Sequence, residues 1–150
     1  MLQPAMIDEA LAPLAFDSSV DVVNLMAPID EDAARDANEV KVVVNRSNDA
    51  LYFSRHPVGW RRGSTAGLFK QVCVIPFRRP FLAKFAALEP TPLEAAESID
   101  MLRALEHGYR VRMAPTAHVT FSVDTPADLA RVSALMESDS LLCSMGSFRL

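Results

Sequence analysis

The sequence predicts a mixed α/β fold, and three observations support this class. Apolar runs rich in Val, Ile and Phe, such as "KVVVN" at 41–45, are typical of buried strands. Other stretches repeat apolar residues every three or four positions, as amphipathic helices do. Two helix starts share the dipeptide Thr-Pro, at 91–92 and 125–126. Strands and helices do not alternate strictly enough for a complete doubly wound sheet.

The chain is predicted to begin with a helix and a strand. The helix covers residues 4–15, and "SVDVVNLMAPI" at 19–29 follows as a strand. The apolar face expected for the helix consists of Ile7, Ala10, Leu11 and Leu14.

A β-hairpin comes next. The β-rich runs 39–45 and 50–56 flank the polar residues "RSND" at 46–49, which is a hairpin signature. Three glycines in 58–67 indicate a mobile loop. The continuous apolar run "FKQVCVIPF" at 69–77 is a candidate buried strand.

One long helix is predicted over residues 91–108. Thr91 is its expected N-cap, Pro92 its first helical residue and Glu94 the acid of a capping box, while Gly108 follows its end. The expected apolar face consists of Leu93, Ala96, Ile99, Leu105 and either Leu102 or Ala104.

A short strand at 109–114 is predicted before the last helix, which starts at "VDTPADL". By analogy with Thr91, Thr125 is the expected N-cap and Asp128 the acid of its first turn. Asp124 then has no part in the helix cap. It lies at the junction between a strand ending at Val123 and the helix, where α/β folds bind ligands. Alternatively, Asp124 caps the helix or lies in solvent.

Residues 1–136 are predicted to form one unit, and 137–150 a loose tail. A net charge of −4 argues against a general nucleic-acid binder. Two cysteines give no disulfide framework, and Cys73 is expected to be buried. With neither a signal peptide nor an apolar run long enough for a membrane span, a cytoplasmic protein without membrane contact is expected.

Two groups of charged residues remain ambiguous from the sequence. The arginine pairs 61–62 and 78–79 could bind a small anion or be solvated. Glu94, Glu97 and Asp100 recur every three residues and could frame a polyhydroxylated ligand, although such acids usually form a solvated helix face. No Gly-rich phosphate loop is found among the five glycines.

Four segments, in this order and spacing, resemble the CMP-Kdo synthetase (3-deoxy-manno-octulosonate cytidylyltransferase) family, over about residues 2–136. They are "EVKVVVNRSNDALYFSRHPVGW", "FKQVCVIPFRRPFL", "PTPLEAAESIDMLRALEHGYRV" and "VDTPADLARV". The resemblance implies a partial nucleotide-diphospho-sugar-transferase-like mixed sheet with flanking helices and a β-hairpin dimerisation element. It also implies that the chain corresponds to the C-terminal part of the family, without the nucleotide-binding half.

The family resemblance also assigns roles to single residues. It implies Asp124 as a ligand of Mg²⁺, and sugar acid and CTP as substrates. The substrate-binding positions that it implies are Arg55, Gln71, Arg78, Glu97 and Asp100. The hydroxyl of the sugar acid would attack the α-phosphate of CTP and release pyrophosphate.

Several of these positions depart from the family pattern. Gln71 replaces a sugar-contacting histidine, and Asp100 and Met101 replace a Glu-Gln pair that holds sugar hydroxyls. Because methionine cannot supply an amide, the sugar-binding wall is expected to be weakened. Because the nucleotide-binding half is missing as well, the chain alone is expected to be inactive. The alternative is a non-catalytic module that forms a homodimer or associates with a full-length synthetase.

Overall fold

The computed structural model describes residues 2–58, 68–137 and 139. Its contacts divide into two units, one from Gln3 to His118 and a second that includes residues 119–137. The helices of the first unit are α1 (Pro4–Phe16), α2 (Glu31–Arg35), α3 (Arg79–Ala86), α4 (Pro92–Glu97) and α5 (Met101–Glu106). Helix α6 (Pro126–Glu137) belongs to the second unit.

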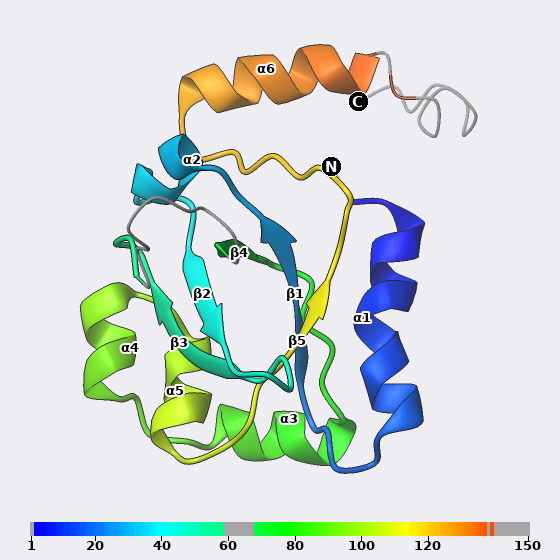
Figure 1. Cartoon of the computed structure of the whole chain (residues 1–150), viewed down its shortest axis with the longest axis vertical. Coiled ribbons are helices and arrows are strands. Elements are labelled where there is room, and N and C mark those ends of the chain that lie inside the picture. The colour runs from blue at the N-terminus through cyan, green and yellow to red at the C-terminus, as the bar shows by residue number, and fades with distance from the viewer. Residues whose placement is uncertain (1, 59–67, 138, 140–150) are drawn as a thin grey trace. The chain divides into compact units, whose positions relative to one another are not determined.

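The described part of the first unit contains a five-stranded mixed sheet in the order β3-β2-β4-β1-β5 (Figure 1). Strand β1 pairs parallel with β5 and antiparallel with β4, and the remaining pairs are antiparallel. This confirms the mixed α/β class. The strands are β1 (Val23–Pro28), β2 (Lys41–Val44), β3 (Ala50–Ser54), β4 (Phe69–Val72) and β5 (Arg112–Pro115).

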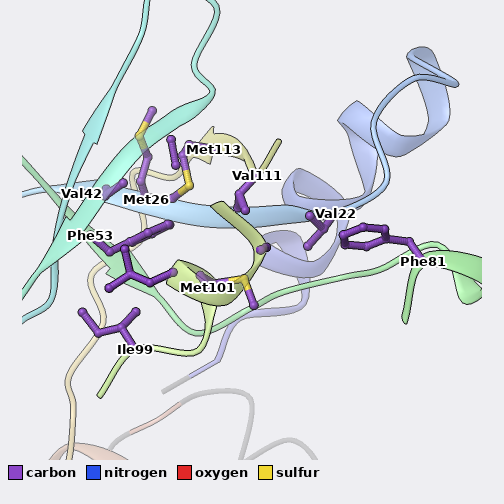
Figure 2. Close-up of a cluster of buried hydrophobic side chains, with 12 residues drawn as sticks. Val22, Met26, Val42, Phe53, Phe81, Ile99, Met101, Val111 and Met113 are labelled. Carbon is purple, nitrogen blue, oxygen red and sulfur yellow. The ribbon is translucent and has the colours of Figure 1, made fainter. Parts of the chain in front are cut away.

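Two apolar clusters hold the sheet between helices. One joins α1 to the sheet through Met6 and Ala10. The other, shown in Figure 2, joins α3 and α5 to β1, β2 and β3 and contains Phe53 and Met101. The buried face of α1 differs from the predicted one, because Ile7 and Leu11 are exposed while Met6 is buried.

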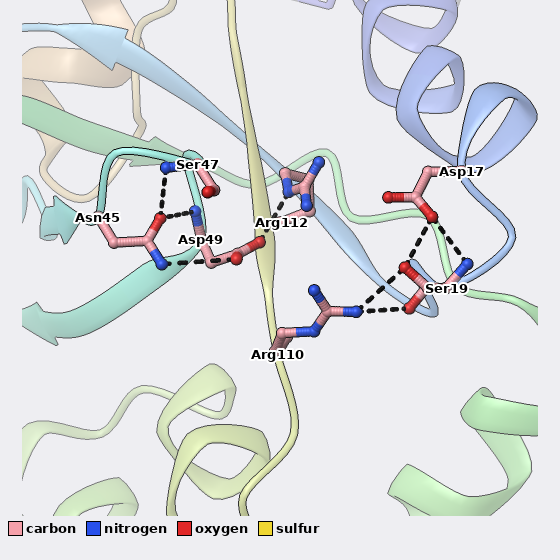
Figure 3. A network of polar contacts seen from close by, with 7 residues as sticks. All are labelled: Asp17, Ser19, Asn45, Ser47, Asp49, Arg110 and Arg112. Carbon is pink, nitrogen blue, oxygen red and sulfur yellow. Dashed lines mark hydrogen bonds and ion pairs between the residues drawn. The ribbon is translucent and has the colours of Figure 1, made fainter.

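The β2–β3 hairpin is confirmed, and its turn is fastened to β5 (Figure 3). Asn45 closes the turn by accepting the N–H groups of Ser47 and Asp49 at 2.8 and 2.9 Å. The Asp49 carboxylate pairs with Arg112 Nε at 2.7 Å. Because both partners are largely buried, this pair holds the turn against β5 and helps to enclose the core cluster beneath the hairpin.

The strand predicted over residues 69–77 ends early, at Val72. The N–H of Val74 turns back to the carbonyl of Val72 at 2.7 Å, which interrupts the ladder. Beyond this turn, the carbonyls of Val74 and Pro76 still accept the N–H groups of Leu25 and Val23, at 3.2 and 3.0 Å. Cys73 lies at this bend and is exposed, so the expectation that it is buried is wrong. The predicted loop at 58–67 lies almost wholly outside the described residues, as does most of the predicted tail.

The helix predicted over residues 91–108 is interrupted, because Ser98 adopts a left-handed conformation (φ 53°). Helix α4 therefore ends at Glu97, and α5 begins at Met101. Thr91 is the N-cap of α4, and its N–H donates to Glu94 at 3.3 Å, as the capping-box pattern predicts. The break lets Ile99 enter the core while Glu97 turns toward β3.

Candidate functional site

Glu97 and Arg55 form the best-connected polar cluster among the predicted site residues. Glu97 ends α4, and its carboxylate accepts three hydrogen bonds from the end of β3. The donors are Tyr52 Oη at 3.2 Å, Ser54 Oγ at 3.0 Å and the Arg55 N–H at 2.8 Å. A carboxylate that already accepts three hydrogen bonds holds elements together and is poorly suited to act as a general acid or base.

The Arg55 guanidinium closes the C-terminal end of α4. Its Nε donates to the Glu97 carbonyl at 2.8 Å, and its Nη2 to the Ser98 carbonyl at 3.4 Å. These carbonyls have no partner within the helix. A cation at this position also interacts favourably with the negative end of the helix dipole. Arg55 thus explains structurally why the predicted long helix stops.

Lys41 supports the same cluster from β2. Its side chain is buried, and its Nζ donates to the carbonyl of Asp36 at 2.7 Å and to the carbonyl of Arg55. Burial lowers the pKa of Lys41, although nearby Asp36, Glu39 and Glu97 oppose this effect. The ammonium therefore joins the loop before β2 to the residue that caps α4.

The charge state of Glu97 follows from its donors. Burial acts to raise the pKa of Glu97, but the N–H of Arg55 and the hydroxyls of Ser54 and Tyr52 outweigh it. The pKa of Glu97 is therefore held below its ordinary value, with a further contribution from His56. Conversely, burial and the Glu97 charge raise the pKa of Tyr52. Glu97 is thus ionised and Tyr52 neutral near pH 7.

Asp100 and Met101 follow this cluster but point to different environments. Asp100 is exposed at the start of α5 and makes no capping bond there. Met101 is 1% exposed and belongs to the core cluster shown in Figure 2. A buried methionine cannot contact a ligand, so of these two positions only Asp100 is accessible.

Gln71 lies on β4, next to a buried residue that sequence reasoning missed. Its Nε2 donates to Asn24 Oδ1 on β1 at 2.6 Å. Asn24 is 0% exposed, and its own amide nitrogen donates to the backbone carbonyls of Val72 and Leu25 at 2.7 and 3.0 Å. A polar residue in the apolar run 20–27 was the only sequence signal for this pair.

Arg78 lies apart from these residues and is engaged by the backbone. Its guanidinium donates to the carbonyls of Val20, Leu14 and Asp17, at 2.7, 2.6 and 3.1 Å. The side chain thereby joins the start of α3 to the end of α1. This geometry favours a structural role over ligand binding.

The second unit contains Asp124 and confirms Thr125 as the N-cap of α6. Thr125 Oγ1 accepts the Asp128 N–H at 3.2 Å, and the Asp128 carboxylate accepts the Thr125 N–H at 3.0 Å. The Thr125 hydroxyl is the main cause of a lowered pKa at Asp128. The side chain of Asp124 is exposed. The strand expected to end at Val123 is not formed, because the chain leaves the sheet after Thr116 bonds to Met26.

Substitutions at the start of α6 are expected to show that Thr125 is its N-cap and that Asp124 is not part of the cap. Thr125→Ala should destabilise α6 by about 1 kcal/mol, because it removes the acceptor of the Asp128 N–H. Asp124→Ala should change its stability little, since the exposed side chain is not part of the cap. Hydrogen exchange of the α6 amides would measure both effects. The reverse order of effects would show that Asp124 is the cap.

The described residues offer no ready-made metal site. Among residues 2–58, 68–137 and 139, no group of three or more His, Cys, Asp or Glu side chains could hold a metal ion. The exposed carboxylate of Asp124 fits Mg²⁺ as a single hard oxygen ligand. No helix in the described part of the chain is both long and apolar enough to cross a membrane.

Comparison with known proteins assigns the fold to a class and the chain to a family. The structure of a CMP:2-keto-3-deoxy-manno-octonic acid synthetase complexed with CTP matches 91% of this chain and 57% of its own, with a TM-score of 0.84 and 36% identity. The fold is thus that of a nucleotidyltransferase. A family model described as "Cytidylyltransferase" matches residues 1–113. The chain belongs to this family of cytidylyltransferases.

Curated relatives specify the branch of the family. The 3-deoxy-manno-octulosonate cytidylyltransferase of Anaeromyxobacter sp. (strain Fw109-5) is 44% identical over 138 residues, 89% of this chain and 57% of that protein. The enzyme of the same name from Solibacter usitatus (strain Ellin6076) is 40% identical over 150 residues, 98% of this chain and 59% of that protein. The chain thus spans somewhat less than three fifths of these relatives.

Proposed function

We propose that this chain provides the part of a 3-deoxy-manno-octulosonate cytidylyltransferase that binds the sugar acid. In the overall reaction, the anomeric hydroxyl of the sugar acid attacks the α-phosphate of CTP, and pyrophosphate leaves. The product is the activated sugar for lipopolysaccharide synthesis, and a cytoplasmic location accords with CTP as a substrate. The backbone match to a CTP-complexed synthetase is the observation that carries this proposal.

Two features of the described residues support binding of the sugar acid. Arg55, Glu97 and Lys41 fix the end of β3 against the break between α4 and α5. That arrangement leaves Asp100 accessible at the start of α5, where its carboxylate can accept hydrogen bonds from sugar hydroxyls. Gln71 offers a second polar contact from the sheet.

Magnesium enters the proposal through Asp124. Mg²⁺ is commonly held by one or two carboxylates together with substrate phosphates, so an exposed single acid is compatible with that arrangement. When bound, the ion would neutralise phosphate charge and favour loss of the hydroxyl proton. In this proposal the chain supplies one oxygen ligand to Mg²⁺, from Asp124.

We expect the 150-residue chain alone to make no CMP-sugar, because Met101, at a position where the resemblance implies an amide that holds sugar hydroxyls, is buried in the core. The experiment is pyrophosphate release with CTP, 3-deoxy-manno-octulosonate and Mg²⁺, and a full-length relative serves as positive control. No release above the protein-free blank is expected. Release that requires both substrates and is abolished by Asp124→Ala would refute inactivity and support catalysis by this chain.

A second candidate function is a non-catalytic association module, and one observation favours it. Strand β3 lies at an edge of the sheet and carries Leu51, which is 60% exposed. Exposed strand edges with apolar side chains are prone to pair with another chain.

A homodimer is therefore expected at micromolar concentration in sedimentation experiments. Leu51→Lys should shift the equilibrium toward monomer, whereas Leu82→Lys, at an exposed position of α3, should not. A wild-type chain that sediments as a monomer, alone and when mixed with a full-length synthetase, would exclude the association module.

A further inference from the structure

The side-chain amides of Asn24 and Gln71 form a chain of hydrogen bonds whose direction is fixed by the backbone. The two carbonyls that Asn24 contacts, those of Val72 and Leu25, can only accept hydrogen bonds. The Asn24 atom that faces them must therefore be its NH₂ group. This conclusion does not depend on how the amide is assigned, because the reversed amide would place oxygen against oxygen.

The direction of the Asn24 amide determines that of Gln71. With its NH₂ group engaged, Asn24 presents Oδ1 to Gln71 across 2.6 Å, so the Gln71 atom at that contact must be the nitrogen. Turning the Gln71 amide over would bring two oxygens together and leave the fully buried Asn24 oxygen without a donor. Gln71 Oε1 is consequently held on the side of the amide away from Asn24.

The neighbouring strands keep this arrangement rigid. Asn24 lies on β1 and Gln71 on β4, two strands that pair in antiparallel register with Met26 opposite Gln71. Gln71 is only partly buried, whereas Asn24 is wholly buried. Among the described residues, none donates a hydrogen bond to Gln71 Oε1. Its carbonyl oxygen is thus available as an acceptor.

We propose that Asn24 is a positioning residue that orients Gln71 so that a carbonyl oxygen faces the ligand. This position then selects a hydrogen-bond donor, such as a sugar hydroxyl, and disfavours carboxylate or phosphate oxygens. The inference rests on the proposed function for its ligand, the sugar acid. The orientation of Gln71 itself depends only on the contacts of Asn24.

The first test concerns orientation and uses the 150-residue chain without ligand. One Gln71 Nε2 proton is expected to exchange slowly in ¹H–¹⁵N spectra, because it is bonded to a buried oxygen. Asn24→Leu, which is similar in size, should make that exchange fast. In Gln71→Met the slow protons of the Asn24 amide should persist, which shows that the sheet is intact. Fast exchange in the wild type, or unchanged slow exchange in Asn24→Leu, would overturn the positioning role.

The second test measures binding of 3-deoxy-manno-octulosonate by calorimetry. Gln71→Met and Asn24→Leu should each weaken binding about tenfold, and the double variant should be no weaker than either single one. A purely structural role of Asn24 would instead give additive losses, which would overturn the proposal. If the wild-type chain binds no sugar acid, the proposed function and the ligand selected here both fail, while the exchange experiment still decides the orientation. If Asn24→Leu does not fold, Asn24→Ala, which also lacks a side-chain acceptor, replaces it in both tests, with the same expected directions.

Discussion

Replacing Phe53 by alanine is expected to lower the free energy of unfolding by about 3–5 kcal/mol. Phe53 is 0% exposed on β3 and lies in the cluster that joins α5 to β1 and β2 (Figure 2). Its removal loses the buried aromatic area and leaves a cavity, because the fastened hairpin turn limits collapse of the strands around it.

Leu51→Ala is the matched control for this substitution. Leu51 lies on the same strand two residues away but is 60% exposed, so its loss should change the free energy of unfolding by less than about 0.5 kcal/mol. Denaturant unfolding of both variants would measure the difference. Similar losses for the two would mean that the hairpin is not packed on the core as described.

The sequence predicted those elements whose signals are local. The Thr-Pro starts at 91–92 and 125–126 became helix starts, and the polar residues 46–49 became the hairpin turn. Helix α2 was missed, although Asp30 caps it in the expected manner by accepting the Ala33 N–H. The short helix α3 was also missed, despite Phe81 and Phe85 at helical spacing.

Errors arose where distant residues decide the local conformation. The break at Ser98 is stabilised by Arg55, which lies 43 residues earlier in the chain, so the periodicity of 91–108 could not reveal it. The end of β4 is set instead by a local turn, in which the Val74 N–H bonds to the Val72 carbonyl. Family resemblance identified Arg55 and Glu97, but their direct contact required the fold. Neither the sequence patterns nor the resemblance led to Asn24, whose only signal is a polar residue within the apolar run 20–27.

Removing the carboxylate that joins α4 to β3 should have the second large effect. Glu97→Ala is expected to lower the free energy of unfolding by about 2–3 kcal/mol, because the Arg55 N–H and the hydroxyl of buried Ser54 lose a charged acceptor. Asp100→Ala removes an exposed acid three residues later and should change stability by less than about 0.5 kcal/mol. Equal effects of the two substitutions would contradict an anchoring role for Glu97.

The pH dependence of stability distinguishes the effect of the Glu97 charge from the effect of its packing. The pKa of Glu97 is lowered in the folded protein, so below its ordinary value of 4.5 the unfolded chain binds more protons than the folded one. The stabilisation is therefore full above that value and is lost as the pH falls through the lowered folded value. Glu97→Gln keeps the size of the side chain but cannot ionise, so its stability deficit relative to wild type should shrink on acidification. Denaturant unfolding between about pH 6 and pH 3 measures this deficit. A deficit that stays constant across this range would show that packing, and not the ionised carboxylate, holds α4 to β3.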